Sequence, residues 1–273
     1  MIGCHCEVCR SEDPRNRRNR PSVLVCYEEP STIADQRTPC TRRLLIDATA
    51  ELRIAALQYG IDQIDGVLIT HAHADHVFGI DDLRRYNAVS GQPMDLFADE
   101  HTYKSLQRIF RYIFEPHCNV NQSFVPQLIL QSIEPGQPFD LFGATWTPLR
   151  LMHGRLPILG FRVDLPGPGG GSLAYCTDVS SIVPDTYPLL EDLDVLVIDA
   201  LRYRHHPTHF TVDQALAQID QIQPGRAYLT HIAHDIEHAD LQARLPEKVY
   251  LSFDGLKVQV ARNKPANSTG MAN

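Results

Sequence analysis

The sequence contains, at positions 71–76, the stretch His71-Ala72-His73-Ala74-Asp75-His76. Three imidazoles and one carboxylate within six residues form a dense set of ligands for zinc and similar divalent metals. The stretch follows an apolar run at 67–69 and precedes Gly79, which predicts a tight turn after a strand. Such a turn can aim the first two histidines at one ion and the last two ligands at a second. A solvated polar loop is the alternative interpretation, and the preceding apolar strand disfavours it.

Other apolar runs also end in polar residues of catalytic type. Asp178 follows the run 172–177, and His231 follows the run 227–230. Because the carboxyl ends of strands can converge on one edge of a sheet, these side chains are expected to approach the 71–76 stretch. Asp47 and Asp199 end two further runs, where they could orient ligand histidines or simply cap the strands.

Short apolar runs alternate with helical patterns, which indicates an α/β fold whose sheets are covered by helices. Strands are predicted at 22–27, 43–47, 66–70, 94–98, 145–152, 159–165, 172–177, 195–200, 227–230 and 257–261. Helices are predicted at 50–59, 100–114, 212–222 and 236–244. The PGPGGG segment at 166–171 is expected to form a hairpin tip. No interdomain linker is evident, so we expect one domain over 1–273, with a flexible polar tail at about 263–273.

Composition narrows the function classes. The 273 residues include no run of 18 apolar residues, so no membrane-spanning helix is expected. The polar N-terminus lacks the apolar core of a signal peptide, which predicts a cytoplasmic protein. The net charge of −8 disfavours phosphate-driven binding to long nucleic acid but is compatible with a small phosphorylated substrate.

Seven cysteines and the lack of an export signal disfavour a disulfide framework. Three of them, Cys4, Cys6 and Cys9, lie within six residues, and three thiolates need a fourth ligand to close a tetrahedral zinc site. Redox-active or merely reduced thiols are the alternative. The remaining four are expected to be ordinary thiols: Cys26, Cys40, Cys118 and Cys176.

The HAHADH stretch resembles the HxHxDH signature of the metallo-β-lactamase superfamily. That resemblance covers almost the whole chain and implies an αβ/βα four-layer sandwich with a two-metal site at one edge. The superfamily's downstream ligands have counterparts in the right order, in LRLMHG, AYCTDVS and YLTHIAH. The implied assignment places His71, His73 and His153 on one metal, Asp75, His76 and His231 on the other, and Asp178 as a bridge.

The segment GCHCEVC, followed by PRNRRNRPS, is similar to the N-terminal region of PhnP-type phosphodiesterases. This resemblance implies a structural zinc in the segment at about 3–21, held by Cys4, Cys6, Cys9 and His234. His5 is the rival fourth ligand, although its neighbours make it sterically awkward. The group also has a histidine over the metals at the position of His209, which implies a phosphate contact or general acid. Members usually begin with a further strand and a TGTG-like turn, whereas this chain begins at Met1.

A dense run of arginines, Arg15, Arg17, Arg18 and Arg20, could steer an anionic substrate. The alternative is that these side chains pair with nearby acidic groups.

These observations favour a metal-dependent phosphodiesterase that acts on a small cyclic phosphodiester of a sugar or nucleotide through a metal-bridging hydroxide. Asp75 and His209 are the expected catalytic residues. The expected cofactors are two catalytic divalent ions, zinc or manganese, and one structural zinc. No long nucleic acid or membrane partner is expected, and a homodimer is left open. The alternatives are a thioesterase of the glyoxalase II type, a tRNA 3′-end nuclease, and a non-enzymatic metal- or redox-sensing protein.

Overall fold

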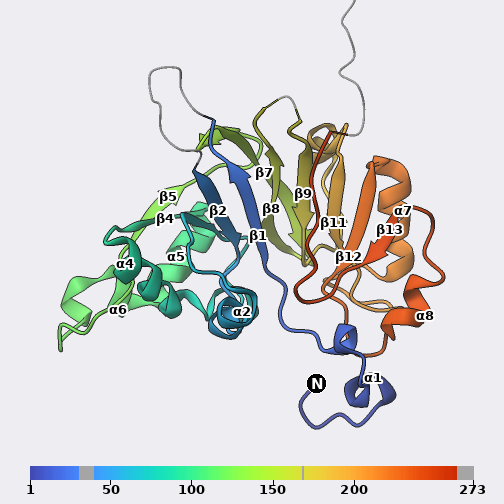
Figure 1. The fold of residues 1–273 in the computed structure, drawn as a ribbon, viewed down its shortest axis with the longest axis horizontal. Coiled ribbons are helices and arrows are strands. Elements are labelled where there is room, and N and C mark those ends of the chain that lie inside the picture. Colours follow the sequence, from blue (N-terminus) through green and yellow to red (C-terminus); the bar gives the residue numbers. More distant parts are fainter. Residues whose placement is uncertain (31–39, 168, 263–273) are drawn as a thin grey trace, which may run out of the picture.

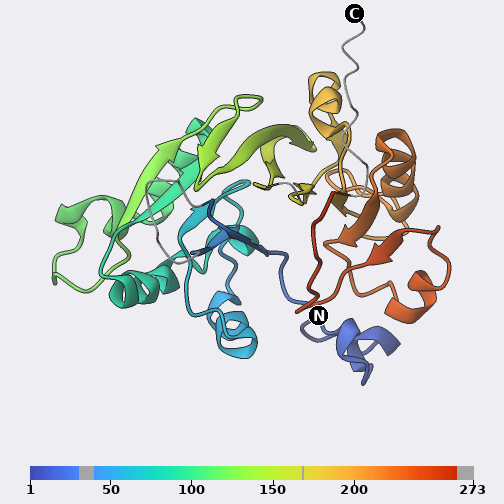
Figure 2. The same ribbon diagram turned by 45° about the horizontal axis from the view of Figure 1, so that its top comes forward.

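The computed structural model describes residues 1–30, 40–167 and 169–262. Two β-sheets lie face to face between two layers of helices (Figures 1 and 2). The first sheet has the strand order β1-β2-β3-β4-β5, formed by β1 (Val23–Glu28), β2 (Thr41–Ile46), β3 (Gly66–Leu68), β4 (Met94–Ala98) and β5 (Leu128–Ser132).

The second sheet has the order β10-β7-β8-β9-β11-β12-β13, with β6 paired to β7. Its strands are β6 (Phe139–Leu141), β7 (Ala144–His153), β8 (Leu156–Asp164), β9 (Ser172–Cys176), β10 (Ser181–Ile182), β11 (Val195–Asp199), β12 (Arg226–Thr230) and β13 (Val249–Leu251). The α-helices are α1 (Glu7–Arg10), α2 (Leu52–Tyr59), α3 (Ala74–Val77), α4 (Arg84–Ser90), α5 (Glu100–Ile109), α6 (Arg111–Phe114), α7 (Val212–Ile222) and α8 (His238–Gln242). Short 3-10 turns are η1 (Pro14–Asn16), η2 (Ile80–Leu83), η3 (Pro116–Cys118) and η4 (Pro184–Leu190).

The core forms three apolar layers. Between the sheets, side chains of the first sheet such as Leu44 and Leu68 pack against the fully buried Trp146 and Phe161 of the second. The outer face of the first sheet is covered by α2, α4 and α5, and that of the second by α7 and α8. This arrangement confirms the predicted αβ/βα four-layer sandwich. Central strands such as β9 are buried along their whole length, as expected for a strand covered on both faces.

Strand direction explains why the site lies where it does. In the first sheet β2, β3, β4 and β5 run parallel, and in the second β9, β11, β12 and β13 do so. Parallel strands present their carboxyl ends at one edge, where sites are commonly built. The residues that follow β2, β3, β9 and β12 are therefore delivered to the same rim of the sandwich.

Several sequence predictions need correction. The predicted helix 100–114 is broken into α5 and α6 at Phe110, whose φ of −111° and ψ of 45° are not helical. The predicted strand 257–261 forms only an isolated bridge between Gly170 and Ala261. Strands β5, β6, β10 and β13 were not predicted. The hairpin at 166–171 is confirmed by the antiparallel pairing of β8 and β9, although residue 168 lies outside the described residues.

The tail at 263–273 also lies outside the described residues, so its predicted flexibility stays a prediction. Within the described ranges, the search for a helix of sufficient length and apolarity to cross a membrane finds none.

A close backbone approach attaches the 71–76 stretch to the loop after β2. The amide of Gly79 donates to the carbonyl oxygen of Ala48 at 2.8 Å. A Cβ at position 79 would lie 2.0 Å from the carbonyl oxygen of Thr49, so glycine is required there. This contact holds α3 against the loop that carries Asp47.

We expect Gly79→Ala to lower the free energy of unfolding by roughly 2–4 kcal/mol, because the added methyl group forces the two segments apart. Urea unfolding of the metal-loaded protein measures the change. The control is Gly169→Ala, whose Cβ would meet no atom within 4 Å and whose stability should stay within about 0.5 kcal/mol of the parent. A Gly79→Ala variant as stable as the parent would contradict the close approach.

Candidate metal centre

Three residues that follow parallel strands adopt the left-handed backbone conformation. Their φ values are 62° at Asp47 after β2, 55° at Asp178 after β9, and 58° at His231 after β12. This region costs a non-glycine residue about 1–3 kcal/mol and persists only where the surroundings impose it. Each turn directs a buried or partly buried polar side chain across the strand ends instead of outward.

The first ligand group consists of His71, His73 and His153, whose ligand atoms all lie within 4.8 Å of one another. Nε2 of His71 lies 2.9 Å from Nδ1 of His73. His153 comes from the end of β7, and its ring centroid lies 5.1 Å from that of His73. Burial, and then the charge of His76, lowers the pKa of His71 to about 2, so that this ring is neutral and able to bind a metal.

The second ligand group consists of Asp75, His76, Asp178 and His231, again within 4.8 Å of one another. Oδ1 of Asp178 lies 3.1 Å from Nε2 of His76 and 3.5 Å from Nε2 of His231. Its other oxygen, Oδ2, lies 3.9 Å from Nε2 of His71. One carboxylate therefore faces both ligand groups, which is the geometry that a bridging ligand requires.

Two partners orient the ligand histidines from outside. Nδ1 of His76 lies 2.7 Å from Oδ2 of Asp47, and the same oxygen accepts a hydrogen bond from the hydroxyl of Thr70 at 2.8 Å. Oδ1 of Asp47 accepts a hydrogen bond from the amide of Thr70, also at 2.8 Å. Nδ1 of His153 donates to the carbonyl oxygen of Thr208 at 2.8 Å. These bonds leave Nε2 of each ring free to face the ligand groups, as in metal sites with oriented histidines.

A buried nitrogen atom without a hydrogen-bond partner indicates that these donor atoms fit divalent ions. Nε2 of His76 is fully buried and has no hydrogen-bond partner among the described residues. It faces the carboxylates of Asp75, at 3.6 Å, and Asp178, at 3.1 Å. A buried polar atom without a partner is costly, and a metal ion between these groups would satisfy it. The residues could thus hold two divalent ions, as the sequence predicts.

Electrostatics distinguish the two ligand groups. Burial by itself lowers the pKa of His231, but the carboxylates of Asp178, Asp75 and Asp199 together outweigh it and raise the pKa to about 9. Similarly, Asp47 and Asp178 raise the pKa of His76 well above its usual range in spite of burial. In the metal-free chain the second group therefore carries protons that a bound ion would displace, whereas His71 carries none.

His209 lies over the ligand groups without belonging to either. Its ring stacks on that of His231 with centroids 4.7 Å apart, and it meets the ring of His153 edge-on at 4.7 Å. Nδ1 of His209 lies 2.8 Å from Oδ2 of Asp199, at the end of β11. Asp199 therefore orients His209 and not a predicted ligand, while Asp47 orients a predicted ligand, His76. Two residues after His209, Thr211 is the N-cap of α7 and forms a full capping box with Gln214.

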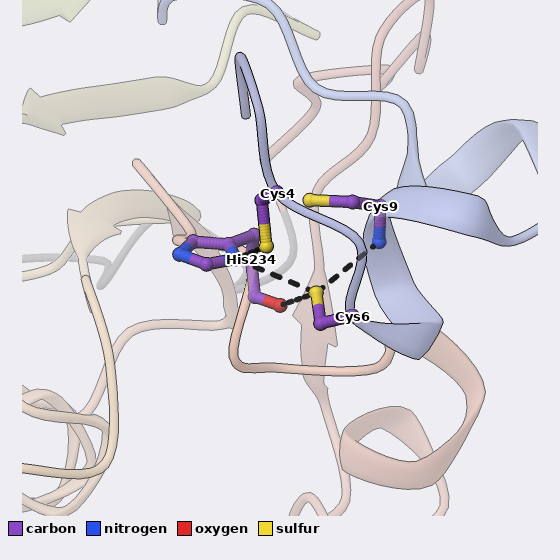
Figure 3. Close-up of side chains that lie close together, drawn as sticks. All are labelled: Cys4, Cys6, Cys9 and His234. Atoms are coloured by element: carbon purple, nitrogen blue, oxygen red, sulfur yellow. Dashed lines mark hydrogen bonds between the residues drawn. The ribbon is translucent and has the colours of Figure 1, made fainter.

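The three N-terminal cysteines converge on His234, as Figure 3 shows. Nδ1 of His234 lies 3.4 Å from Sγ of Cys4 and 3.5 Å from Sγ of Cys6. With zinc–sulfur bonds of about 2.3 Å and zinc–nitrogen bonds of about 2.0 Å, the S···N edge of a tetrahedral site is about 3.5 Å. The hydrogen bonds from His234 and from the amide of Cys9 lower the pKa of Cys6 to about 6, which favours the thiolate. The rival ligand His5 is exposed and lies outside this group.

The arginine run serves mainly to hold the N-terminal segment in place. Arg15 pairs with Asp13 and Arg20 with Glu51. The guanidinium of Arg18 donates to the carbonyl oxygen of Ala233 at 2.7 Å, between His231 and His234. Two of the four arginines, Arg15 and Arg20, therefore pair with acidic groups, whereas Arg18 binds a backbone carbonyl oxygen.

Sequence reasoning missed the supporting groups Thr70 and Thr208. Thr70 directly precedes the 71–76 stretch, and this position could have indicated that its side chain supports the ligand groups. Thr208 contributes only its backbone carbonyl, which no residue pattern reveals.

We expect His234→Ala to lose one bound metal ion of a predicted total of about three and to melt at a lower temperature. Activity per folded molecule should fall modestly, because a closed four-ligand site has no open position for a substrate. Elemental analysis, melting temperature and specific activity are compared with those of His231→Ala, which should lose most activity. If His234→Ala binds as many metals as the parent and melts like it, the cysteine site does not use this histidine.

Similarity to known proteins shows the family of the chain. A family model described as a beta-lactamase superfamily domain matches residues 42–232. The crystal structure of a new diphosphatase from the PhnP family is 36% identical, with a TM-score of 0.80 over 96% of this chain and 92% of that chain. Human tRNase Z, short form, is 18% identical with a TM-score of 0.66 over 90% of this chain and 95% of its own, which shows a shared fold alone.

A curated relative named octanoyltransferase, from Porphyromonas gingivalis (strain ATCC BAA-308 / W83), is 36% identical over 261 residues. The match covers 94% of this chain, and the chain spans about half, 48%, of that longer protein. The family model and the PhnP-family structure each cover most of the present chain, and they confirm the resemblance seen in the sequence. The chain thus belongs to the metallo-β-lactamase superfamily and, within it, to the PhnP family.

Proposed function

We propose that this chain is a two-metal phosphodiesterase that hydrolyses a small phosphodiester, with a cyclic ester of a sugar or nucleotide as the favoured substrate. The observation that carries the proposal is the buried pair His209–Asp199. Nδ1 of His209 lies 2.8 Å from Oδ2 of Asp199, and the ring of His209 stacks on that of the predicted ligand His231. A phosphodiester has an alkoxide leaving group that needs a proton, and a held imidazole can supply it. The similarity to a PhnP-family diphosphatase supports phosphoryl chemistry.

When bound, two divalent ions would activate a water molecule and neutralise charge on the phosphoryl oxygens. The chain's contribution is to hold the donor atoms in place: His71, His73 and His153 for one ion, Asp75, His76 and His231 for the other, and Asp178 between them. Zinc and manganese both suit these nitrogen and oxygen donors.

Proton delivery falls to His209. Burial, and then the charge of His231, lowers the pKa of His209 to about 4, so the free ring is neutral near pH 7. An anionic phosphodiester beside the ring would favour its charged form, and Asp199 would stabilise that charge from the other nitrogen. The proton is then available at Nε2, on the side of the ring that faces away from Asp199.

A panel of three substrates tests the reaction class. Bis-p-nitrophenyl phosphate reports phosphodiester hydrolysis, an octanoyl thioester reports the thioesterase alternative, and nitrocefin reports β-lactam hydrolysis. Turnover of the thioester alone would favour acyl chemistry, in line with the name of the octanoyltransferase relative. If the protein keeps its function when the predicted metal-ligand residues are substituted, the non-enzymatic sensing alternative would be favoured.

Asp178→Ala should reduce phosphodiester turnover by at least about 10³-fold, because the two ligand groups lose the carboxylate that they share. The matched control is Asp62→Ala, since the Asp62 side chain is 81% exposed and remote from both groups. Steady-state kinetics with bis-p-nitrophenyl phosphate, together with circular dichroism to verify folding, measure the effect. Unchanged turnover in a folded Asp178→Ala protein would refute the two-metal assignment.

His209→Ala should slow hydrolysis of a nucleoside 2′,3′-cyclic phosphate on the order of 10²–10⁴-fold. The hydrolysis of bis-p-nitrophenyl phosphate should slow much less in this variant, because p-nitrophenolate leaves without a proton. His205→Ala, in the exposed part of the same loop, is the control and should behave like the parent. Equal losses on both substrates, together with loss of a metal ion, would instead make His209 a ligand, since it also lies within ligand distance of His153 and Asp178.

A further inference from the structure

A row of hydrogen bonds between loop backbones runs beside the metal centre. The amide of Ala233 donates to the carbonyl oxygen of Leu201 at 2.8 Å, and the amide of Leu201 donates to the carbonyl oxygen of Phe210 at 3.0 Å. The amide of Phe210 in turn donates to the carbonyl oxygen of Val179 at 2.7 Å. The loops that follow β9, β11 and β12, and the loop that precedes α7, are thus joined to one another outside the sheet. These four residues are here called the loop row.

Each member of the loop row lies one or two residues after a residue of the candidate site. In order from Ala233 to Val179, these site residues are His231, Asp199, His209 and Asp178. The backbones of His231 and Asp178 are left-handed, a conformation that costs free energy and persists where the surroundings impose it. The loop row supplies such surroundings, and it joins a predicted metal ligand to the pair His209–Asp199.

Arg18 of the N-terminal segment completes the loop row at its outer end. Its Nη1 donates to the carbonyl oxygen of Ala233 at 2.7 Å, whereas the amide of Ile236 reaches the same oxygen at 3.4 Å. A hydrogen bond from a charged guanidinium is also stronger than one from a neutral amide. Arg18 is therefore the main partner of this carbonyl group, and the amide of the same residue is held by Leu201.

The buried side chain of Asn16 holds the guanidinium in this position. Its Oδ1 accepts hydrogen bonds from Nη2 of Arg18 at 3.0 Å and from the amide of His238 at 2.9 Å. Its Nδ2 donates to the carboxylate of Glu237 at 2.6 Å. Figure 1 shows the N-terminal segment, in blue, beside α8, in orange. Arg18 is thus anchored both to its own segment and to the far end of the loop that begins at His231.

The surroundings of Arg18 keep its charge in spite of partial burial. Burial lowers the pKa of the guanidinium, and four carboxylates oppose this effect: Glu237, Asp254, Asp235 and Asp13. Nε of Arg18 is buried and has no hydrogen-bond partner among the described residues. Loss of one member of such a network leaves its partners unsatisfied, so a substitution of Arg18 should be felt at Ala233.

We propose that Arg18 is a positioning residue of the metal centre. By holding Ala233 it fixes the loop row, and with it the placement of the predicted ligand His231 relative to the predicted proton donor His209. The hydrogen bonds of its guanidinium go to groups outside both ligand groups, so Arg18 acts through the loop row. The expected effect on turnover rests on the proposed phosphodiesterase function, whereas the expected effect on the loops does not.

Arg18→Ala should lower kcat for a nucleoside 2′,3′-cyclic phosphate about 10–100-fold, because a displacement of ~1 Å can cost a rate of that order. KM should change little, since Arg18 is not expected to touch the substrate. The hydrolysis of bis-p-nitrophenyl phosphate should slow less, because its leaving group needs no proton from His209. A merely structural role would lower the melting temperature and leave the ratio of the two rates unchanged.

Two further variants make the comparison specific. Arg18→Lys keeps the charge but lacks the fork of donors that reaches both Ala233 and Asn16, so its kcat should lie between those of the parent and Arg18→Ala. It also replaces Arg18→Ala in every comparison if that variant does not fold. Arg10→Ala, which removes an exposed arginine of the same segment, is the matched control and should keep the parent rates. A parent-like kcat in the Arg18 variants, or equal slowing of both substrates, overturns the positioning role.

Hydrogen exchange separates failure of this inference from failure of the proposed function. In the metal-loaded Arg18→Ala protein, the amides of Ala233 and Leu201 should exchange at least about tenfold faster than in the parent, the loss expected for a hydrogen bond to a charged group. The amides within β12 should exchange as in the parent. If neither ester is hydrolysed but exchange rises in this pattern, the proposed function fails and the positioning role stands. Unchanged exchange at both amides overturns the positioning role, whether or not the esters are hydrolysed.

Discussion

The carboxylate of Asp178 is the contact on which the rest of the centre depends. It lies within 3.9 Å of His71, His76 and His231, so it faces ligands that follow a strand of each sheet. A carboxylate that is 2% exposed is stable only beside compensating charge, supplied here by protonated histidines or by metal ions. The sandwich has to bring the two sheet edges together at this point, and the interior packing of Trp146 and Phe161 holds them there.

The N-terminal segment acts on the same rim from the outside. Its cysteines contact His234, and Arg18 holds the carbonyl oxygen of Ala233 at 2.7 Å, within three residues of the ligand His231. A site of this kind, with four protein donors, leaves no position for a substrate, whereas the central ligand groups leave room for one. This difference fits the proposal that one cluster positions a loop and that the other carries out the reaction.

The substrate side of the centre is asymmetric. His209 and Asp199 lie beside the ligand groups near His153 and His231, and a cavity of about 270 Å³ opens beside His71 and His73. A substrate that reached from this cavity to His209 would lie in one direction across the ligand groups, and a fixed orientation can supply a large part of a reaction's rate.

The sequence by itself determined the class of fold, and it named the residues that the structure brings together in the two ligand groups. Strand periodicity and metal-ligand chemistry pointed to the 71–76 stretch and to Asp178 and His231, because both are local properties. The resemblance of HAHADH to a superfamily signature supplied the four-layer sandwich and His153. The sequence did not show that α5 ends at Phe110, whose backbone is not helical. It also missed the three-residue β13, because the existence of so short a strand depends on its pairing with β12. Only the tertiary structure decided that Asp47 serves His76 while Asp199 serves His209. The reason is that these contacts join groups far apart in the chain or depend on what packs nearby, and no local pattern encodes them.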